Sequence, residues 1–271
     1  MLHETYRFLV KRSAKVRRLR GGLLYWLAAL FLRDAPIVFM NYGYVPSGEE
    51  GPALLPEDTE DRLAIQLYHR LTGEVDLRGR DVLEVSSGRG GGASYLMRYF
   101  GPRSMVGVDR SRKLVEFCRR RHRVPGLEFA AGDAEGLDHD PESFDFAVNV
   151  EASHCYGQMD RFLRAVWNVI RPGGFLLWTD FRPAPKTAAL RDEFRDAGWQ
   201  TEVEEDITDN VLRAMSQEHH RWHRLIEERI PAPLRGPFRE TAGVKGSRIE
   251  QAMRRGEVRY LRFALRKAER E

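Results

Sequence analysis

Short apolar runs recur along the middle of the chain, each followed by a turn and then by a segment of mixed composition. Such runs are typical of buried strands, and the intervening segments are typical of helices. The pattern predicts strands at 81–85, 104–109, 127–131, 143–150 and 175–180. It also predicts helices from 93, at 111–122 and at 159–170, and an amphipathic helix beside the sheet at 57–71.

Beyond residue 180 the same alternation continues. It predicts a helix near 187–197, a strand near 199–205, a long helix at about 209–229, and a final helix followed by a strand at 258–265. Strands that alternate with helices in this way predict an α/β fold. With 42% hydrophobic residues, the chain of 271 residues can bury a substantial core. We expect one main domain over 57–271 and an appendage over 1–56.

A glycine-dense turn follows the first predicted strand, in the sequence DVLEVSSGRGGG at 81–92. Its spacing is E-x-S-x-G-x-G from Glu84, with Ser86 where a first glycine is usual. Glycine allows positive φ and close approach of a ligand to the main chain, so Gly88 and Gly90 are expected at a nucleotide-type cofactor. The turn alone is ambiguous, because a similar turn opens the dinucleotide-binding fold.

Polar residues stand where two later strands end. Asp109 ends the second predicted strand, 19 residues beyond Gly90. A carboxylate at that place can accept both ribose hydroxyls of a bound nucleoside. Glu151 and His154 follow the fourth strand. Because ligands of such sheets bind outside the carboxyl ends of the strands, we expect the binding site at this edge.

Together these motifs resemble those of class I S-adenosylmethionine-dependent methyltransferases. The glycine turn resembles motif I, GDAE at 132–135 resembles the adenine-binding turn, and RPGG at 171–174 is another hallmark, expected here to stop a helix and turn the chain into a strand. The resemblance implies a Rossmann-like class I methyltransferase fold. That fold has a seven-stranded, mostly parallel sheet with its last strand antiparallel, helices on both faces and an N-terminal helical lid.

The resemblance also implies where S-adenosylmethionine binds. Asp109 would accept from the ribose, Asp133 from the adenine amino group, and Glu84 would act through the turn backbone and the cofactor's amino group. NYGY at 41–44 resembles an element that closes over the cofactor, although an aromatic turn can equally seal a core. The expected cofactor-binding residues are Tyr42, Glu84, Ser86, Gly88, Gly90, Asp109, Arg110, Asp133, Ala134, Glu135 and Glu151.

More narrowly, EVSSGRGGGAS, GLEFAAGDAE, NVEASHCY and FMNYGY resemble O-methyltransferases of lipid and polyketide natural products, including the phthiotriol and phenolphthiotriol dimycocerosate methyltransferases. The resemblance implies methyl transfer to a hydroxyl of an apolar small molecule. One alternative keeps the fold and the cofactor but promotes a cyclisation. Others are a nicotinamide-dependent oxidoreductase and a membrane-docking accessory protein.

His154 is the predicted general base, since it stands three residues beyond Glu151 at the edge where cofactor and acceptor must meet. An unperturbed pKa near 6.5 would leave its imidazole mostly neutral and able to take the hydroxyl proton. In the alternative, His154 hydrogen-bonds a loop carbonyl or lines the pocket. Proximity alone, or another residue such as Tyr42, would then explain the reaction.

Composition limits the remaining classes. Two cysteines, Cys118 and Cys155, without a C-x-x-C pair, suggest neither a disulfide framework nor a zinc site and fit a reducing cytoplasm. No basic and aromatic surface typical of nucleic-acid binding is evident, so no nucleic-acid partner is expected. His219 and His223 are four residues apart on a predicted helix, but a metal needs further ligands, and no metal is expected.

A basic and apolar segment opens the chain. Six cations crowd residues 11–20, and ten apolar residues follow at 23–32, too few for a membrane span of roughly 20. Export is not expected, because no clear cleavage site follows. Residues 11–32 could contact a membrane surface as an amphipathic helix, or dock on the catalytic domain as a lid. The sequence is compatible with both interpretations, and it does not indicate an oligomeric state.

Overall fold

The computed structural model describes residues 37–48 and 51–269 of the chain. The predictions for residues 11–32, and for a lid formed by residues before 37, lie outside this part. Within the described ranges, no helix combines the length and apolar character that a membrane span requires.

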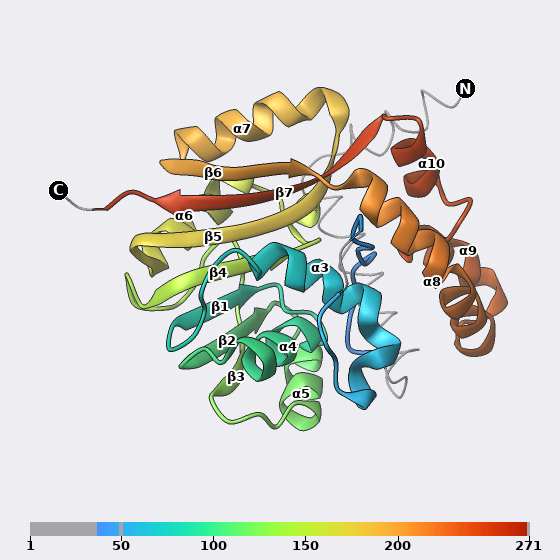
Figure 1. Cartoon of the computed structure of the whole chain (residues 1–271), viewed down its shortest axis with the longest axis horizontal. Coiled ribbons are helices and arrows are strands. Elements are labelled where there is room, and N and C mark those ends of the chain that lie inside the picture. Colours follow the sequence, from blue (N-terminus) through green and yellow to red (C-terminus); the bar gives the residue numbers. More distant parts are fainter. Residues whose placement is uncertain (1–36, 49–50, 270–271) are drawn as a thin grey trace.

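One mixed sheet forms the centre of the described chain (Figure 1). Its seven strands lie in the order β3-β2-β1-β4-β5-β7-β6, and β7 runs antiparallel to β5 and β6. The predicted sheet of a class I methyltransferase, with its last strand antiparallel, is therefore confirmed. The strands are β1 (Asp81–Val85), β2 (Ser104–Asp109), β3 (Leu127–Ala131), β4 (Phe144–Val150), β5 (Ile170–Pro183), β6 (Trp199–Asp206) and β7 (Val258–Lys267).

The RPGG segment behaves differently from the prediction. It was expected to form a turn before the fifth strand, but residues 171–174 lie inside β5, which begins at Ile170. The pairing of β5 with β4 is irregular at this point. A side chain at Gly174 would lie 2.4 Å from the carbonyl oxygen of Asp145. Phe144 pairs with Ile170 and Phe146 with Phe175, so residues 171–174 bulge out of the pairing with β4. Gly173, with a left-handed φ of 78°, and Gly174, at its close approach to β4, permit this bulge within the strand.

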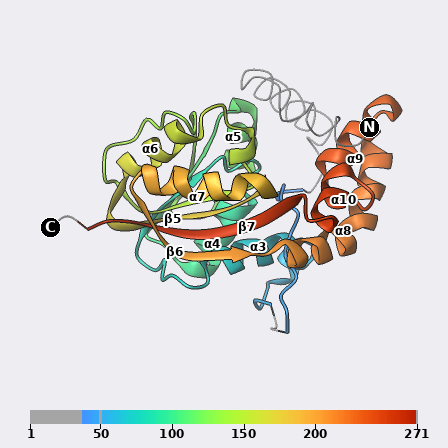
Figure 2. The ribbon, with the colours of Figure 1, turned by 90° about the horizontal axis from the view of Figure 1, so that it is seen from above.

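Helices cover both faces of the sheet. Figure 2 shows α3 and α4 on one face and α6 and α7 on the other. The predicted helix at 57–71 begins as a 3-10 turn and becomes α-helical only from Arg62. The helices around the sheet are η1 (Pro56–Asp61), α3 (Arg62–Thr72), α4 (Gly91–Phe100), α5 (Arg112–Arg121), η2 (Ser153–Cys155), α6 (Met159–Val169), η3 (Ala184–Lys186) and α7 (Thr187–Asp196).

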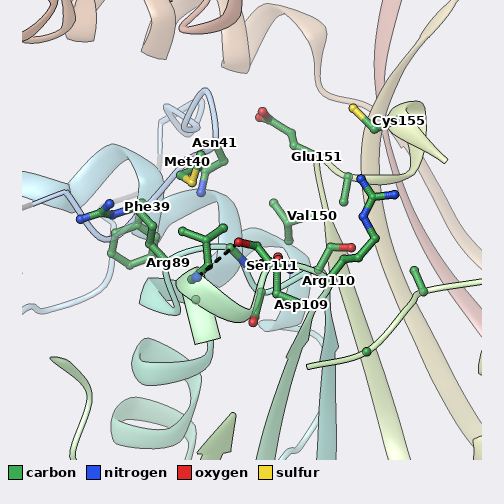
Figure 3. Close-up of a pocket in the computed structure, with 18 of the residues that line it drawn as sticks. Phe39, Met40, Asn41, Arg89, Asp109, Arg110, Ser111, Val150, Glu151 and Cys155 are labelled. Carbon is green, nitrogen blue, oxygen red and sulfur yellow. Dashed lines mark hydrogen bonds between the residues drawn. The ribbon is translucent and has the colours of Figure 1, made fainter. Parts of the chain in front are cut away.

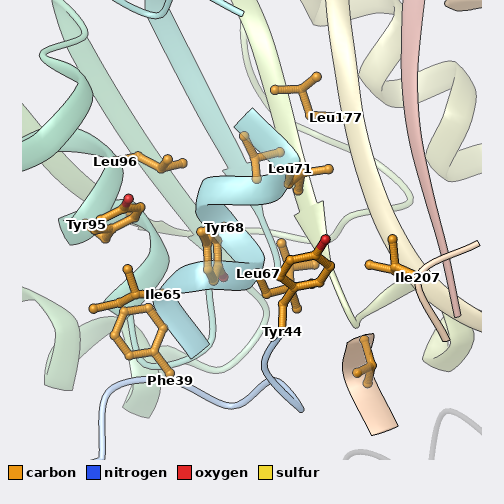
Figure 4. Packing of buried hydrophobic residues seen from close by; sticks show 14 of the residues in the cluster. Phe39, Tyr44, Ile65, Leu67, Tyr68, Leu71, Tyr95, Leu96, Leu177 and Ile207 are labelled. Atoms are coloured by element: carbon orange, nitrogen blue, oxygen red, sulfur yellow. The ribbon is translucent and has the colours of Figure 1, made fainter. Parts of the chain in front are cut away.

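Each face of the sheet has its own apolar core. Adjacent residues of β1 point to opposite faces, so Val82 belongs to the core beneath α3 and α4, and Leu83 to the core beneath α6 and α7. Both side chains are completely buried. Figure 4 shows the first core, where Tyr68 and Leu71 of α3 face Leu96 of α4. Burial on both sides explains why the central strands are continuous apolar runs in the sequence.

Three further helices lie between β6 and β7, beyond the end of the sheet where the parallel strands finish (Figures 1 and 2). They are α8 (Thr208–Arg229), α9 (Ala232–Thr241) and α10 (Arg248–Arg254). The predicted long helix is α8, whereas α9 was not predicted. Ile226, Ile230 and Phe238 form a small separate core that also includes Ile37. These helices therefore pack against the chain at Ile37.

Residues 37–48 form a strap that joins the glycine turn, α3 and α8. The Val38 carbonyl accepts from Gly91 N–H at 3.1 Å, and Tyr44 N–H donates to Leu63 at 2.9 Å. Val45 N–H donates to Asn210 of α8 at 3.2 Å. Backbone bonds at several points hold an extended segment in one path across the carboxyl edge of the sheet.

The glycines that open α4 make room for other parts of the protein. A β-carbon at Gly92 would lie 2.1 Å from the Tyr68 ring, and one at Gly91 would lie 2.6 Å from the Val38 carbonyl oxygen. A β-carbon at Gly90 would lie 2.8 Å from the Phe129 ring. These glycines are therefore required by packing of α3, the strap and β3 against the turn.

We expect Gly92→Ala to lower the melting temperature. Overpacking costs roughly 1–3 kcal/mol, which exceeds the gain of about 1 kcal/mol from the higher helix propensity of alanine. Gly136→Ala is the control, because a β-carbon there meets nothing within 4 Å. Thermal unfolding followed by circular dichroism measures both. Equal melting temperatures in the two variants would contradict the packing described here.

Candidate active site

A cavity of about 300 Å³ lies at the carboxyl ends of β1, β2 and β4. In Figure 3, Phe39 to Asn41 of the strap lie on one side and Glu151 and Cys155 on the other, with Asp109 between them. The wall is formed by Val38, Phe39, Met40, Asn41, Tyr68, Ser86, Ser87, Gly88, Arg89, Gly92, Asp109, Arg110, Ser111, Leu114, Gly132, Asp133, Ala134, Glu135, Val150, Glu151, Ala152, Cys155 and Tyr156.

The turn after β1 presents its backbone to the cavity. Ser86 has φ of 63° and Gly88 has φ of 55°, both left-handed. This conformation explains why glycine is usual at the position of Ser86, which is held here by a 2.7 Å hydrogen bond between its hydroxyl and that of Tyr156. The Ser87 hydroxyl is buried on the cavity wall without a partner among the described residues. A polar ligand in the cavity could satisfy it.

Asp109 fixes the shape of the turn. One carboxylate oxygen accepts from Gly88 N–H at 3.0 Å, and the other accepts from Ser111 N–H at 2.8 Å. Ser111 in turn caps α5 by accepting from Leu114 N–H. Burial raises the pKa of Asp109 despite these two bonds. The carboxylate therefore lies on the cavity wall at the end of β2, where the sequence placed it.

The turn after β3 forms another part of the wall. One Asp133 oxygen accepts from Glu135 N–H at 3.1 Å. Glu135 accepts from Gly157 N–H at 2.8 Å, which ties this turn to the segment that follows β4. Asp133, Ala134 and Glu135 all line the cavity, together with Arg110. The structure thus brings the separate sequence motifs to one site.

Glu151 closes the cavity at the end of β4. Its φ of 46° is left-handed, which is uncommon for a residue with a side chain. Oε1 accepts from Tyr42 N–H at 2.7 Å and from the Tyr260 hydroxyl at 2.6 Å. Burial raises the pKa of Glu151 to about 8, against the lowering effect of these bonds. The strap and β7 therefore meet at one buried carboxyl group on the cavity wall.

Three expected cofactor contacts do not line the cavity. The Glu84 side chain points toward α3, where Oε1 accepts from the Tyr68 hydroxyl at 2.6 Å, and burial raises its pKa to about 7. Gly90 packs against Phe129, as described above. The Tyr42 ring stacks on Phe181 at 5.9 Å, outside the cavity. Strand and turn periodicity predicted the position of these residues but not the direction in which they face.

His154 also lies off the cavity wall. Its Nδ1 is 2.8 Å from Oδ1 of Asp180, its backbone N–H donates to the other oxygen at 2.8 Å, and its ring stacks on Phe181 at 4.3 Å. Burial acts to lower the His154 pKa, but the charge of Asp180 prevails and raises it well above the ordinary value. The expectation of an ordinary, mostly neutral imidazole is therefore wrong. Asp180 is completely buried, and Arg182 is 3.0 Å from its second oxygen.

Sequence reasoning missed several residues of the wall. Arg89 is almost fully buried, donates to the Ile37 carbonyl and covers the Phe117 ring at 3.9 Å. Tyr156 lines the cavity and accepts from Asn149 at 2.8 Å. Both stand inside quoted motifs, so their position in the sequence was a usable signal. Met40 of the strap also lines the cavity and stands inside a quoted motif, FMNYGY.

The two histidines of α8 lie apart from the cavity wall. The rings of His219 and His223 are 5.8 Å apart between centroids. The described residues contain no group of three histidine, cysteine, aspartate or glutamate side chains that could hold a metal ion.

The cavity residues fit a nucleoside cofactor with a cationic end. Gly88 leaves the turn open on the cavity side, where only Met40 comes within 4 Å of the missing β-carbon. The buried Ser87 hydroxyl and the carboxyl groups of Asp109, Asp133 and Glu151 supply polar contacts. Fold and site define a class I S-adenosylmethionine-dependent methyltransferase.

Comparison with known proteins agrees with this class. Residues 83–178 match the model of a methyltransferase domain. The chain is 40% identical over 264 residues to the phthiotriol/phenolphthiotriol dimycocerosates methyltransferase of Mycobacterium tuberculosis strain H37Rv, covering 96% of this chain and 97% of that one. It is 40% identical to a fatty-acid O-methyltransferase of Mycolicibacterium smegmatis, covering 82% and 81%. The chain belongs to the methyltransferase family that includes these two enzymes.

Solved structures share the fold at low sequence identity. The 4+2 cyclase SpnF superposes with a TM-score of 0.69 at 20% identity, covering 92% of this chain and 96% of that one. Geranyl diphosphate C-methyltransferase from Streptomyces coelicolor, solved with S-adenosylhomocysteine, superposes with a TM-score of 0.63 at 14% identity, covering 89% and 96%. The likeness concerns the fold alone.

Replacing Asp109 should weaken cofactor binding. Asp109→Ala removes a charged acceptor and frees the N–H groups of Gly88 and Ser111, so the loss should be about 1.5–3 kcal/mol, or roughly 10-fold to 150-fold in Kd. Calorimetry with S-adenosylhomocysteine measures the Kd. The control is Asp138→Ala, because Asp138 is an exposed aspartate in the loop between β3 and β4. Unchanged affinity in Asp109→Ala would remove Asp109 from the site.

Proposed function

We propose that the enzyme methylates a hydroxyl group of an apolar lipid or polyketide. The observation that carries the proposal is the cavity at the carboxyl edge, whose wall joins Ser86, Asp109, Asp133 and Glu151 from four separate motifs. The names of the relatives, a phthiotriol methyltransferase and a fatty-acid O-methyltransferase, support an acceptor of this class.

The residues proposed to hold the cofactor are those of the wall. Asp109 would receive the ribose, the Asp133 turn the adenine, and the backbone at Gly88 the part of the molecule that crosses the glycine turn. When bound, S-adenosylmethionine supplies an electrophilic methyl group on a sulfonium. The protein must then hold the acceptor in line and exclude water, and such positioning can supply roughly 7–11 kcal/mol of the barrier.

We propose that His154 remains the candidate base, acting together with Asp180. The bond to Asp180 holds Nδ1, so Nε2 is the ring nitrogen that could take the hydroxyl proton. The next residue, Cys155, interacts electrostatically with this imidazole and lines the cavity. The His154 side chain itself does not line the cavity. Glu151 is the alternative base, because its carboxyl group reaches the wall directly.

Methyl transfer can be tested directly. The full chain, incubated with S-adenosylmethionine and long-chain fatty acids or hydroxylated polyketide lipids, should yield a product heavier by one methylene unit in mass spectrometry. Asp109→Ala should reduce that yield at limiting cofactor, and Asp138→Ala should not. A rearranged product of unchanged mass would support the cyclase alternative instead. Binding of NAD, with none of S-adenosylhomocysteine, would favour an oxidoreductase.

The pH dependence of turnover should identify the base. Because Asp180 raises the pKa of His154, the neutral imidazole becomes more abundant as pH rises, so turnover should increase above neutral pH. His154→Gln should cost roughly 100-fold to 10,000-fold in turnover and remove the increase, with cofactor affinity unchanged.

Glu151→Gln provides the comparison. If Glu151 were the base, the increase would have its midpoint near the Glu151 pKa of about 8 and would disappear in Glu151→Gln. It would then persist in His154→Gln. Near-normal turnover in both variants would leave positioning without a protein base as the explanation.

A further inference from the structure

A basic face covers the solvent side of α5. The segment 110–128 contains seven arginine and lysine residues and two glutamates, a local net charge of +5, whereas the whole chain carries a net charge of only +4. All seven cations are exposed. The basic face consists of Arg110, Arg112, Lys113, Arg119, Arg120, Arg121 and Arg123.

The helix separates these cations from its apolar residues. Leu114, Val115 and Cys118 are buried against the sheet. At 100° per residue, Arg112, Lys113 and Arg120 fall on the opposite arc, with Glu116 as the acid among them. Arg119 lies on the flank beside Val115 and donates to the Phe129 carbonyl of β3 at 2.9 Å. The basic face begins at the cavity, whose wall includes Arg110 and Leu114, and extends about 15 Å along the helix.

Helix stability does not account for these cations. A helix N-terminus carries partial positive charge, which favours acids in the first turn, but α5 has no acid there and has Arg112 and Lys113 instead. Nor do ion pairs among the described residues account for four of the seven. Arg112, Arg119, Arg120 and Arg123 form no ion pair with other described residues, whereas arginines such as Arg98 and Arg103 do.

The chemistry of the surface indicates the kind of partner. Protein interfaces usually contain an apolar or aromatic centre. Among the described residues, Leu55 is the large hydrophobic residue that is exposed, and it lies outside α5. The basic face therefore has no such centre. A cationic face without an apolar centre matches a diffuse anionic surface. We propose that α5 docks the enzyme on a bilayer that contains anionic lipid, and does so independently of residues 11–32.

The choice of a bilayer rests on the proposed function, because an apolar acceptor partitions into lipid. Docking through α5 would bring the cavity rim at Arg110 to the membrane surface. An acceptor leaving the bilayer would then reach the cavity without crossing water.

Vesicle co-sedimentation of the full chain tests the proposal without any acceptor. Binding to vesicles of phosphatidylcholine with phosphatidylglycerol should exceed binding to phosphatidylcholine alone, and should weaken as salt shortens the Debye length from about 10 Å at 0.1 M to about 3 Å at 1 M. Replacing Arg112, Arg120 and Arg123 with glutamine should weaken binding roughly 100-fold, since each cation near an anionic surface contributes roughly fivefold.

A matched triple variant distinguishes an effect of the basic face from an effect of the net charge of the protein. Arg161, Arg224 and Arg229 are exposed arginines of α6 and α8, and replacing them with glutamine removes the same charge. Equal loss of binding in both triple variants would overturn the proposal. So would the absence of anionic preference, or binding of an acidic carrier protein in place of vesicles.

Turnover of detergent-dispersed acceptor distinguishes the two proposals. The α5 variant should retain it, because none of its three replaced residues lines the cavity. Vesicle binding without methyl transfer would overturn the proposed function alone. Methyl transfer without vesicle binding would overturn only the docking of α5.

Discussion

The site depends on how closely three other segments approach the glycine turn. Gly92 allows the Tyr68 ring to lie against the start of α4, and Gly91 allows the strap to hydrogen-bond there. The Tyr68 hydroxyl then reaches Glu84 inside β1. Interiors are packed so tightly that one added methyl group at such a contact displaces its neighbours. The absence of side chains therefore holds helix, strap and strand in the arrangement that leaves the cavity open.

The acids near this cavity differ from those elsewhere in the chain. Asp81 pairs with Arg103 and Arg171, and the completely buried Asp180 pairs with Arg182. Glu84, Asp109 and Glu151 are held by N–H or hydroxyl donors and form no ion pair with described residues. Burial raises the pKa of all three. Such a group of acids favours a cationic ligand, whose charge would offset the cost of their burial.

Much of this arrangement could be predicted from the sequence. Strand positions follow from apolar runs between turn residues, and the motifs after β1, β2, β3 and β4 converge because parallel strands end at one edge. Side-chain direction could not be predicted in the same way. Glu84 and Ser86 are two residues apart, yet Glu84 faces α3 and Ser86 faces the cavity. The left-handed φ of Ser86, set by tertiary contacts, redirects the chain between them.

The role of His154 shows a second limit. Its partner Asp180 is 26 residues away, on β5, so no local pattern reveals that a buried carboxylate will raise the imidazole pKa. The strap is similar, since Tyr42 and Glu151 are 109 residues apart when they share a hydrogen bond. Local periodicity gives the elements, whereas the protonation states of the site come from contacts that only the folded chain creates.

Tyr260 has a consequence for the order in which the enzyme matures. It belongs to β7, the last strand of the chain, which inserts antiparallel between β5 and β6. Its hydroxyl supplies one of the two donors to Glu151, 109 residues earlier. During synthesis the strands β1 to β5 emerge first and can pair, but Glu151 lacks this donor until β7 has entered the sheet. A chain that stops before β7 would keep every cofactor motif, yet Glu151 on the cavity wall would lack one of its two donors, so the buried carboxyl group is fully hydrogen-bonded only after β7 has entered the sheet.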